Sequence, residues 1–348
     1  MRAAAPWLGL GAATAVFALA LSAVGFPSPT LFAALVVGLA FALARPQAGL
    51  RPPGWSFVAA QAVVGVTLGA YMQSEALAAA AHEWLPVTLV SAATLGISMG
   101  AGRVLARFTA LDVPTATLGM IAGGASGIVT MASDLGGDDR LVAFMQYLRV
   151  LVVVLLTPLL IAAFGAGGGG SAGPGPAAFG APPDWLLTAA IAAGAALVAR
   201  RVDVPAGTLL GPMVVAGALT LAGVEFAVPP ALRELAFALI GLQVGLRFTL
   251  GTVKLLGRLI IPVLGALFGL LIGCAGLAVL LVWTTDVSFR DAYLATTPGG
   301  LYAVLAVAVG AGANTTFILA VQVLRLLVAV LLAPLAVRRI ARAGRPQG

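Results

Sequence analysis

Two pairs of polar residues, Gln146 with Arg149 and Gln322 with Arg325, lie inside long apolar stretches of the sequence. Each pair is spaced i and i+3, so its two side chains share one face of a helix. Each arginine lies about ten residues into its stretch, near the bilayer centre, where an arginine must face a cavity or a partner. We therefore predict that the pairs hold a negatively charged ligand. The alternative is a structural arginine that satisfies the carbonyl groups of a neighbouring broken helix.

Two glycine pairs recur at equivalent places, one in "AGGASG" from Ala122 to Gly127 and one in "TPGGLY" from Thr297 to Tyr302. Broken backbone at membrane depth is tolerated only where it is buried or lines an aqueous cavity, and its free N–H groups attract anions. We predict a substrate site at the two breaks, with a purely structural kink as the alternative. Its predicted lining is Gly123, Gly124, Ser126, Thr297, Pro298, Gly299 and Gly300.

Two further polar residues are candidates for the lining of this cavity. Gln243 lies between the repeated glycines of its apolar stretch, and its amide needs a partner in lipid; an interhelical hydrogen bond is the alternative role. Asn314 takes the place that Asp138 has in the first half, and Gly310 takes the place of Asp134. This asymmetry fits a single site for a cation or a proton. The alternative is that Asp134 and Asp138 are exposed acids in a loop.

The acidic residues indicate the charge of the ligand. All 12 Asp and Glu residues lie at or near the ends of apolar stretches, so no carboxylate is predicted at mid-depth. Two central guanidinium groups without central acids fit an anionic, carboxylate-bearing ligand. An antiporter with a central carboxylate pair is disfavoured, although backbone and hydroxyl oxygens leave Na⁺ or H⁺ coupling open. Because His82 and Cys274 are the single His and Cys, we expect no metal site, no cofactor and no enzyme activity.

These residues must be positioned by a chain that is 61% hydrophobic and 9% charged, with a mean hydropathy of +1.09. Apolar runs long enough to cross about 30 Å of hydrocarbon recur almost end to end, without the alternation of strands. The sequence predicts an all-α polytopic membrane protein whose partner is the lipid bilayer. The net charge of +7 is scattered singly between apolar runs, so no nucleic-acid partner is expected.

The chain contains one repeat twice. A shift of 176 positions aligns Gly65 with Gly241, Arg149 with Arg325 and Pro158 with Pro334 without a gap. We predict a first membrane repeat (1–164), a Gly/Pro-rich linker (165–183), a second repeat (184–337) and a basic tail (338–348). The expected apolar segments are 7–24, 29–44, 56–72, 85–107, 113–133 and 139–164, matched by 184–200, 205–223, 231–248, 257–283, 289–311 and 314–337.

Basic residues in loops indicate whether the second repeat is inverted. If the fifth segment of each repeat is re-entrant, five segments per repeat cross the bilayer, and the basic residues divide 15 to 2 in favour of the cytoplasm. If all six segments cross, giving twelve crossings, the division is 11 to 6. The charge bias therefore favours two inverted repeats of five transmembrane helices plus one re-entrant segment each. Both termini are then cytoplasmic and the linker lies outside.

The run "ASDLGGDDRLVAFMQYLRVLVVVLLTPLL", with "TPGGL" and "LAVQVLRLLVAVLLAPL" in the second half, resembles the AbrB-type duplicated membrane protein family of bacteria. The resemblance covers essentially the whole chain and implies a location in the bacterial inner membrane. Family members carry the labels ammonia monooxygenase and regulator of gene expression. This sequence lacks metal ligands for the first and a soluble DNA-binding domain for the second. Ala122 stands where many relatives have a proline, so the two glycine-pair tips differ.

The sequence therefore predicts a secondary transporter of a small organic anion, with a site near the midplane between inverted repeats. The alternative is an integral membrane sensor or regulator that uses the same cavity without transport and affects gene expression indirectly. Association into a homo-oligomer is left open.

Overall fold

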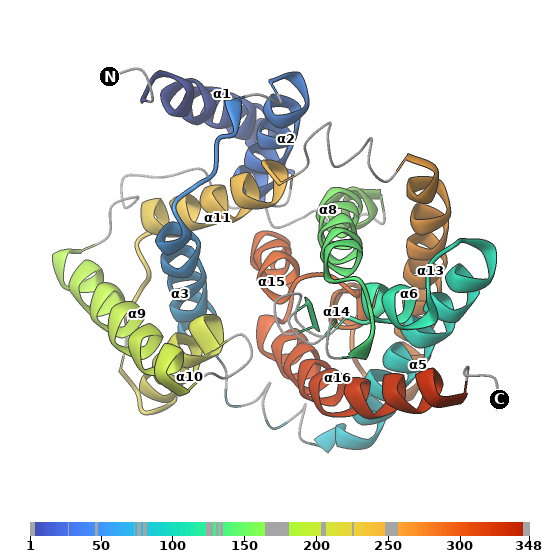
Figure 1. Cartoon of the computed structure of the whole chain (residues 1–348). Coiled ribbons are helices and arrows are strands. Elements are labelled where there is room, and N and C mark those ends of the chain that lie inside the picture. Colours follow the sequence, from blue (N-terminus) through green and yellow to red (C-terminus); the bar gives the residue numbers. More distant parts are fainter. Residues whose placement is uncertain are drawn as a thin grey trace. The chain divides into compact units, whose positions relative to one another are not determined.

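The computed structural model describes residues 4–26, 28–45, 48–72, 74, 78, 82–122, 128–129, 132, 135–163, 181–202, 207–224, 226–247 and 257–343. Every regular element within these residues is a helix (Figure 1). The prediction of an all-helical chain is therefore confirmed.

The helices reproduce the duplication. Those of the first repeat are α1 (Ala4–Ala23), α2 (Pro29–Ala44), α3 (Gly54–Ala70), α5 (Trp84–Phe108), α6 (Val113–Met120) and α8 (Asp139–Ala163). Those of the second are α9 (Pro182–Val202), α10 (Gly207–Leu221), α11 (Pro230–Gly245), η3 (Gly257–Leu259), α13 (Ile260–Thr284), α14 (Phe289–Thr296), α15 (Leu301–Gly310) and α16 (Thr315–Ala343). The bounds of α5 and α6, and the start of α8, recur 176 residues later in α13, α14 and α16. Because α16 continues to Ala343, the first part of the expected basic tail is helical.

Several helices are suited to a lipid environment. Among the described residues, those long and apolar enough to cross a membrane are Pro6–Ala23, Trp84–Phe108, Asp139–Ile161 and Gly257–Thr284. Further apolar helices of 10–17 residues include Pro29–Ala44 and Gly54–Ala70. The protein is therefore a helical membrane protein, whereas the number of crossings stays a prediction.

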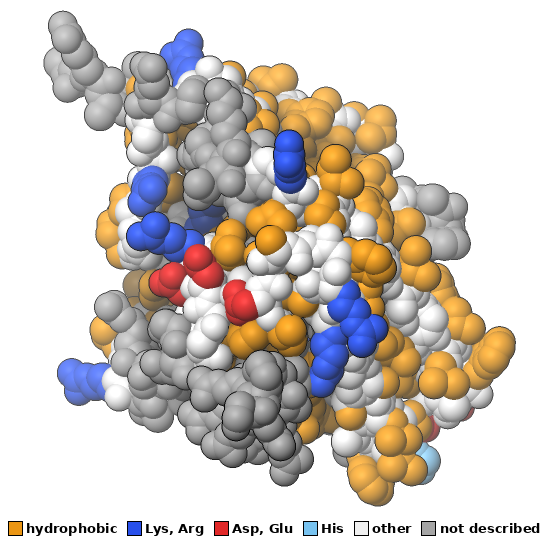
Figure 2. All heavy atoms as spheres, turned by 45° about the vertical axis from the view of Figure 1, so that its right-hand side comes forward, with side chains coloured by type: hydrophobic (Ala, Val, Ile, Leu, Met, Phe, Trp, Pro, Cys, Tyr) orange, Lys and Arg blue, Asp and Glu red, His pale blue; other side chains and the backbone are white. Residues whose placement is uncertain are grey.

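The tryptophans mark helix ends. Trp7, Trp55, Trp84 and Trp185 lie at or near the starts of their helices, and Trp283 lies one residue before the end of α13. Trp55, Trp84 and Trp283 are between 63% and 81% exposed. Hydrophobic side chains also cover much of the face shown in Figure 2. Tryptophan is enriched where membrane helices meet the lipid–water interface, so this placement agrees with a membrane protein.

The helices form two compact units, and each unit draws on both repeats. The first unit contains α1, α2, α3, α9, α10, α11 and α15. The second contains α5, α6, α13, α14, α8 up to Val153 and α16 from Phe317. In the first unit one core cluster joins Leu10 of α1 and Ala34 of α2 to Leu242 of α11. The repeats are therefore interlocked rather than folded as separate halves.

Glycines that recur between the repeats hold two helix pairs of the first unit together. Gly65 and Gly69 of α3 lie against α10, and the two glycines of α11 lie against α2, so closely that an added Cβ would overlap the facing backbone. Small residues allow this approach between membrane helices. In both pairs, residues later in one helix contact residues later in the other helix, so the two helices of each pair run parallel. The contacts are Gly65 with Leu209, Gly69 with Met213, Gly241 with Leu31 and Gly245 with Leu35.

Gly65→Ala is expected to lower the free energy of unfolding by about 1–3 kcal/mol, because its methyl group overlaps the main chain of α10 at Leu209. Titration of the purified protein with SDS from mixed micelles measures the change. The matched control is Gly194→Ala on α9, where no atom lies within 4 Å of an added Cβ. That variant should be neutral or slightly more stable. An unchanged unfolding free energy for Gly65→Ala would contradict the close contact of α3 with α10.

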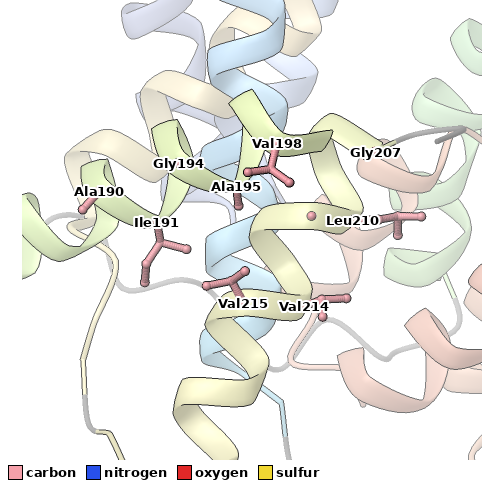
Figure 3. A pocket seen from close by; sticks show the side chains of 10 residues that line it. Ala190, Ile191, Gly194, Ala195, Val198, Gly207, Leu210, Val214 and Val215 are labelled. Carbon is pink, nitrogen blue, oxygen red and sulfur yellow. The ribbon is translucent and has the colours of Figure 1, made fainter. Parts of the chain in front are cut away.

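An open groove of about 760 Å³ lies between α9 and α10 (Figure 3). Its walls carry Ala, Gly, Ile, Leu and Val residues, among them Ile191, Val198 and Val215. No polar side chain lines it, so the groove is unsuited to the anionic ligand that the sequence predicts.

Candidate functional site

Two short helices, α6 and α14, carry the main-chain groups of the candidate site. Each follows a residue that caps its amino end. The Asp112 carboxylate accepts from the Thr115 N–H at 2.8 Å, and the Ser288 hydroxyl accepts from the Asp291 N–H at 3.2 Å. Each helix has 8 residues and is about 12 Å long, less than half the hydrocarbon thickness. Each is therefore too short to cross a bilayer by itself.

The two helices end in the same backbone conformation. Thr297 has φ −55° and ψ 126° and precedes Pro298, and a residue before proline is disfavoured in an α-helix. Ile121 has φ −68° and ψ 125°, although Ala122 follows it. The break at this residue therefore does not require the proline. The predicted segment 289–311 is divided into α14 and α15 at the expected glycine pair, Gly299 and Gly300.

Gln146 and Arg149 of α8 cap the carboxyl end of α6. Nε2 of Gln146 donates to the Leu118 carbonyl at 2.7 Å and to the Ile121 carbonyl at 2.9 Å. Nη1 of Arg149 donates to the Ile121 carbonyl at 2.9 Å and to the Met120 carbonyl at 3.5 Å. Nη2 of Arg149 donates to Oε1 of Gln146 at 2.7 Å. Both side chains are buried. We name these two residues and three carbonyls the first clamp.

The second clamp repeats this arrangement at the carboxyl end of α14. Nε2 of Gln322 donates to the carbonyls of Leu294 at 2.9 Å and Thr297 at 3.3 Å. Nη1 of Arg325 donates to the carbonyls of Thr297 at 2.7 Å and Thr296 at 3.4 Å. Nη2 of Arg325 donates to Oε1 of Gln322. Each hydrogen bond described for the first clamp thus has a counterpart 176 residues later.

The clamps show what the paired residues do in the fold. Both arginines satisfy carbonyl groups of a broken helix, which is the structural role considered as the alternative. Ligand binding by Arg149 and Arg325 stays a prediction. Arg325 is 5% exposed, and its Nε–H has no hydrogen-bond partner among the described residues. Its remaining donor makes Arg325 a candidate for binding an anion.

The two clamps adjoin one apolar core within the second unit. A single cluster contains Leu118 and Ile121, whose carbonyls belong to the first clamp, together with Ala329 of α16. Ala329 lies about one helical turn beyond Arg325. The two broken helices therefore end near the same core.

The chain returns to the start of α6 after its first break. The Asp138 N–H donates to Oγ1 of Thr115 at 2.8 Å, so residues 23 positions apart meet. Oδ1 of Asp138 accepts from the N–H groups of Arg140 and Leu141 at 2.9 and 3.1 Å, which caps α8. The Asp138 carboxylate thus serves a helix terminus at an exposed position. Asp134 lies outside the described residues.

The helix that follows the second break, α15, packs against a residue of the first unit. The Ser28 hydroxyl donates to the Ala306 carbonyl, and an added Cβ at Gly310 would overlap Ser28. This contact explains why α15 belongs to the first unit, while α14 belongs to the second.

The remaining predicted site residues are distributed over the chain. Gly123, Gly124 and Ser126 lie outside the described residues. Thr297, Pro298 and Gly299 are buried beside the second clamp, and Gly300 is half-buried. Gln243 is half-buried on α11, and its Oε1 has no hydrogen-bond partner among the described residues. Asn314 is exposed and lines a cavity of about 210 Å³ with Tyr71 and Thr315. Gln243 and Asn314 belong to the first unit, so Thr297, Gln322 and Arg325 are the predicted residues brought together at the second clamp.

Sequence reasoning missed the hydrogen-bond acceptors of the clamps, because Leu118, Met120 and Leu294 contribute main-chain carbonyls rather than side chains. Thr115 was also missed, although its place after the capping Asp112 signals a helix start. Within the described part of the chain no group of three or more His, Cys, Asp and Glu residues is arranged to hold a metal ion.

A family model described as "Transition state regulatory protein AbrB" matches residues 30–341. The chain belongs to the AbrB family. Both clamps lie within the matched part of this AbrB-family chain. "Putative regulator AbrB" of Escherichia coli (strain K12) is 34% identical over 321 residues, which cover 90% of each chain. "Uncharacterized protein YhjN" of Bacillus subtilis (strain 168) is 25% identical over 336 residues, which cover 90% of this chain and 88% of that relative.

Proposed function

We propose that this membrane protein is a secondary transporter of a small organic anion of the carboxylate type, and not an enzyme. The observation that carries the proposal is the second clamp. There a buried guanidinium, Arg325, lies at the carboxyl end of α14, and its Nε–H has no hydrogen-bond partner among the described residues. A guanidinium with a remaining donor is suited to binding a carboxylate.

Charge balance at the second clamp supports an anion. A helix carries roughly −0.5 elementary charge at its carboxyl end and roughly +0.5 at its amino end. The carboxyl end of α14 therefore offsets about half of the charge of Arg325, and about half of a positive charge remains. The ion pairs found among the described residues involve Arg233, Arg290 and His82, not Arg325. A buried site with this surplus favours a negatively charged ligand.

Helix directions support two inverted repeats of five crossings each. The short segment 45–53 joins α2 to α3, so the two run in opposite directions if both cross the bilayer. Since α10 runs parallel to α3, it then runs opposite to α2, its counterpart in the first repeat. The contact of Asp138 with Thr115 supports a re-entrant fifth segment, because its two ends lie together. In such an arrangement the sites of the two repeats face each other near the midplane.

The inverted topology places both termini in the cytoplasm of a bacterial cell and the linker outside the inner membrane. Single cysteines introduced into a Cys274→Ala background test it with an impermeant thiol reagent. Ser171→Cys in the linker should react in intact cells, whereas Gln347→Cys near the carboxyl terminus should react only after permeabilisation. The opposite labelling pattern would exclude the inverted arrangement with cytoplasmic termini.

Uptake into proteoliposomes tests the transport function directly. A panel of small radiolabelled carboxylates is offered with and without Na⁺ and pH gradients. At least one of them should accumulate or exchange above the level of protein-free liposomes, and excess unlabelled carboxylate should compete with it. The absence of uptake for a carboxylate that the protein binds would contradict transport.

A membrane sensor that affects gene expression indirectly is the second candidate function. It is favoured by the word "regulator" in the name of the Escherichia coli relative. Saturable binding of a carboxylate without uptake, in the same proteoliposomes, is the result that would favour it.

A further inference from the structure

Each clamp gathers neutral oxygen atoms around one guanidinium. In the first clamp the carbonyl oxygens of Met120 and Ile121 and Oε1 of Gln146 lie 2.7–3.5 Å from the Nη atoms of Arg149. In the second clamp the same set comes from Thr296, Thr297 and Gln322. Carbonyl and amide oxygens are the ligands that small hard cations prefer. Carboxyl ends of broken helices also coordinate Na⁺ in transporters.

We propose that Arg149 and Arg325 each fill a latent monovalent-cation site, so that a tethered guanidinium stands where a coupling sodium ion would otherwise bind. The native protein then takes up no Na⁺ at these two helix ends. When the arginine is removed, Na⁺ binds between the vacated oxygens. The cation sites themselves do not depend on the proposed function. Only one consequence rests on it, namely that the clamps do not couple carboxylate transport to a Na⁺ gradient.

The physical need for a cation follows from the burial of the clamps. At each clamp the carboxyl end of a helix, with about half a negative charge, lies beside several carbonyl oxygens. Gln146 and Gln322 there are at most 1% exposed, so water does not solvate these oxygens. A positive charge must therefore be supplied at each helix end. Arginine stays protonated in proteins, and its covalent tether keeps it in place. A coupling ion, in contrast, has to enter and leave during transport. The clamps therefore provide a permanent charge.

Thermal unfolding of the purified full-length protein tests this without any substrate. We expect the wild type to have the same Tm in sodium chloride and in choline chloride of equal concentration. Arg149→Ala and Arg325→Ala should have a low Tm in choline chloride. Sodium chloride should raise it by about 2 °C, the shift expected for a chain of this length when Na⁺ is about tenfold above its Kd. Millimolar methylguanidinium, which replaces the missing group, should raise it as well.

Two variants serve as controls. Arg140→Ala removes an exposed arginine from the same helix as Arg149, and it should show no difference between the two salts. Arg325→Lys keeps a tethered cation at the second clamp, so its Tm should also be the same in both salts.

The proposal is overturned if Na⁺ raises the Tm of the wild type above its value in choline chloride. It is also overturned if the alanine variants respond equally to both salts, or fail to fold in every salt while Arg325→Lys folds. If the wild type shows no carboxylate uptake but the alanine variants still respond to sodium, the transport function is contradicted and the cation sites are supported.

Discussion

Arg325→Gln is expected to reduce carboxylate binding and uptake nearly to background. The variant loses the buried positive charge and the Nε–H donor that no described residue uses. Truncating one partner of a buried charge pair costs about 2–5 kcal/mol, which weakens binding by roughly thirtyfold to several thousandfold. Uptake into proteoliposomes and equilibrium binding of the same carboxylate measure the two effects.

Two further variants separate charge, shape and folding. Arg325→Lys keeps the charge but loses the planar fork of donors, so an intermediate affinity is expected. Arg149→Gln removes an equivalent cap and should cost similar stability, with a smaller loss of binding, because Ala122 replaces the proline at its tip. A stably folded Arg325→Gln variant that binds the carboxylate undiminished would refute ligand binding by Arg325. If that variant does not fold, Arg325 is a structural cap for α14.

Gln322→Met is expected to lower the free energy of unfolding by about 2 kcal/mol or more. The amide of Gln322 donates to the carbonyls of Leu294 and Thr297 and accepts from Arg325, and it is 1% exposed. Methionine keeps the length of the side chain but makes none of these hydrogen bonds. The buried Leu294 carbonyl and a guanidinium N–H lose their partner, at about 1–3 kcal/mol each, whereas the Thr297 carbonyl keeps its hydrogen bond from Arg325. Titration with SDS from mixed micelles measures the difference.

Gln61→Met is the matched control for this substitution. Gln61 of α3 is half-buried and accepts one hydrogen bond, from the Thr208 hydroxyl at 2.7 Å. Its replacement should cost about 1 kcal/mol. Gln146→Met should cost as much as Gln322→Met, because the first clamp has the same hydrogen bonds. A loss for Gln322→Met no larger than that for Gln61→Met would show that the clamp does not stabilise the broken helix.

The sequence alone determined the helices, the duplication and the family. Apolar runs interrupted by polar or proline residues define helix ends directly, because a membrane helix must be apolar along its length. The spacing of i and i+3 also predicted that Gln146 and Arg149 would share a helix face, as Gln322 and Arg325 do, and both pairs act together in the structure. The break at Gly299 and Gly300 was predicted because glycine and proline interrupt a helix locally.

Only the tertiary structure decided what the two pairs contact. Their partners are main-chain carbonyls of Leu118, Ile121 and Thr297, and every residue carries such a carbonyl, so no residue type marks it in advance. The same holds for the contacts of Asp138 with Thr115 and of Ser28 with Ala306, which join segments far apart in the chain. A sequence records the polarity of side chains and their local spacing. Which backbone groups are left unpaired, and which distant side chain satisfies them, depends on how the segments pack against one another.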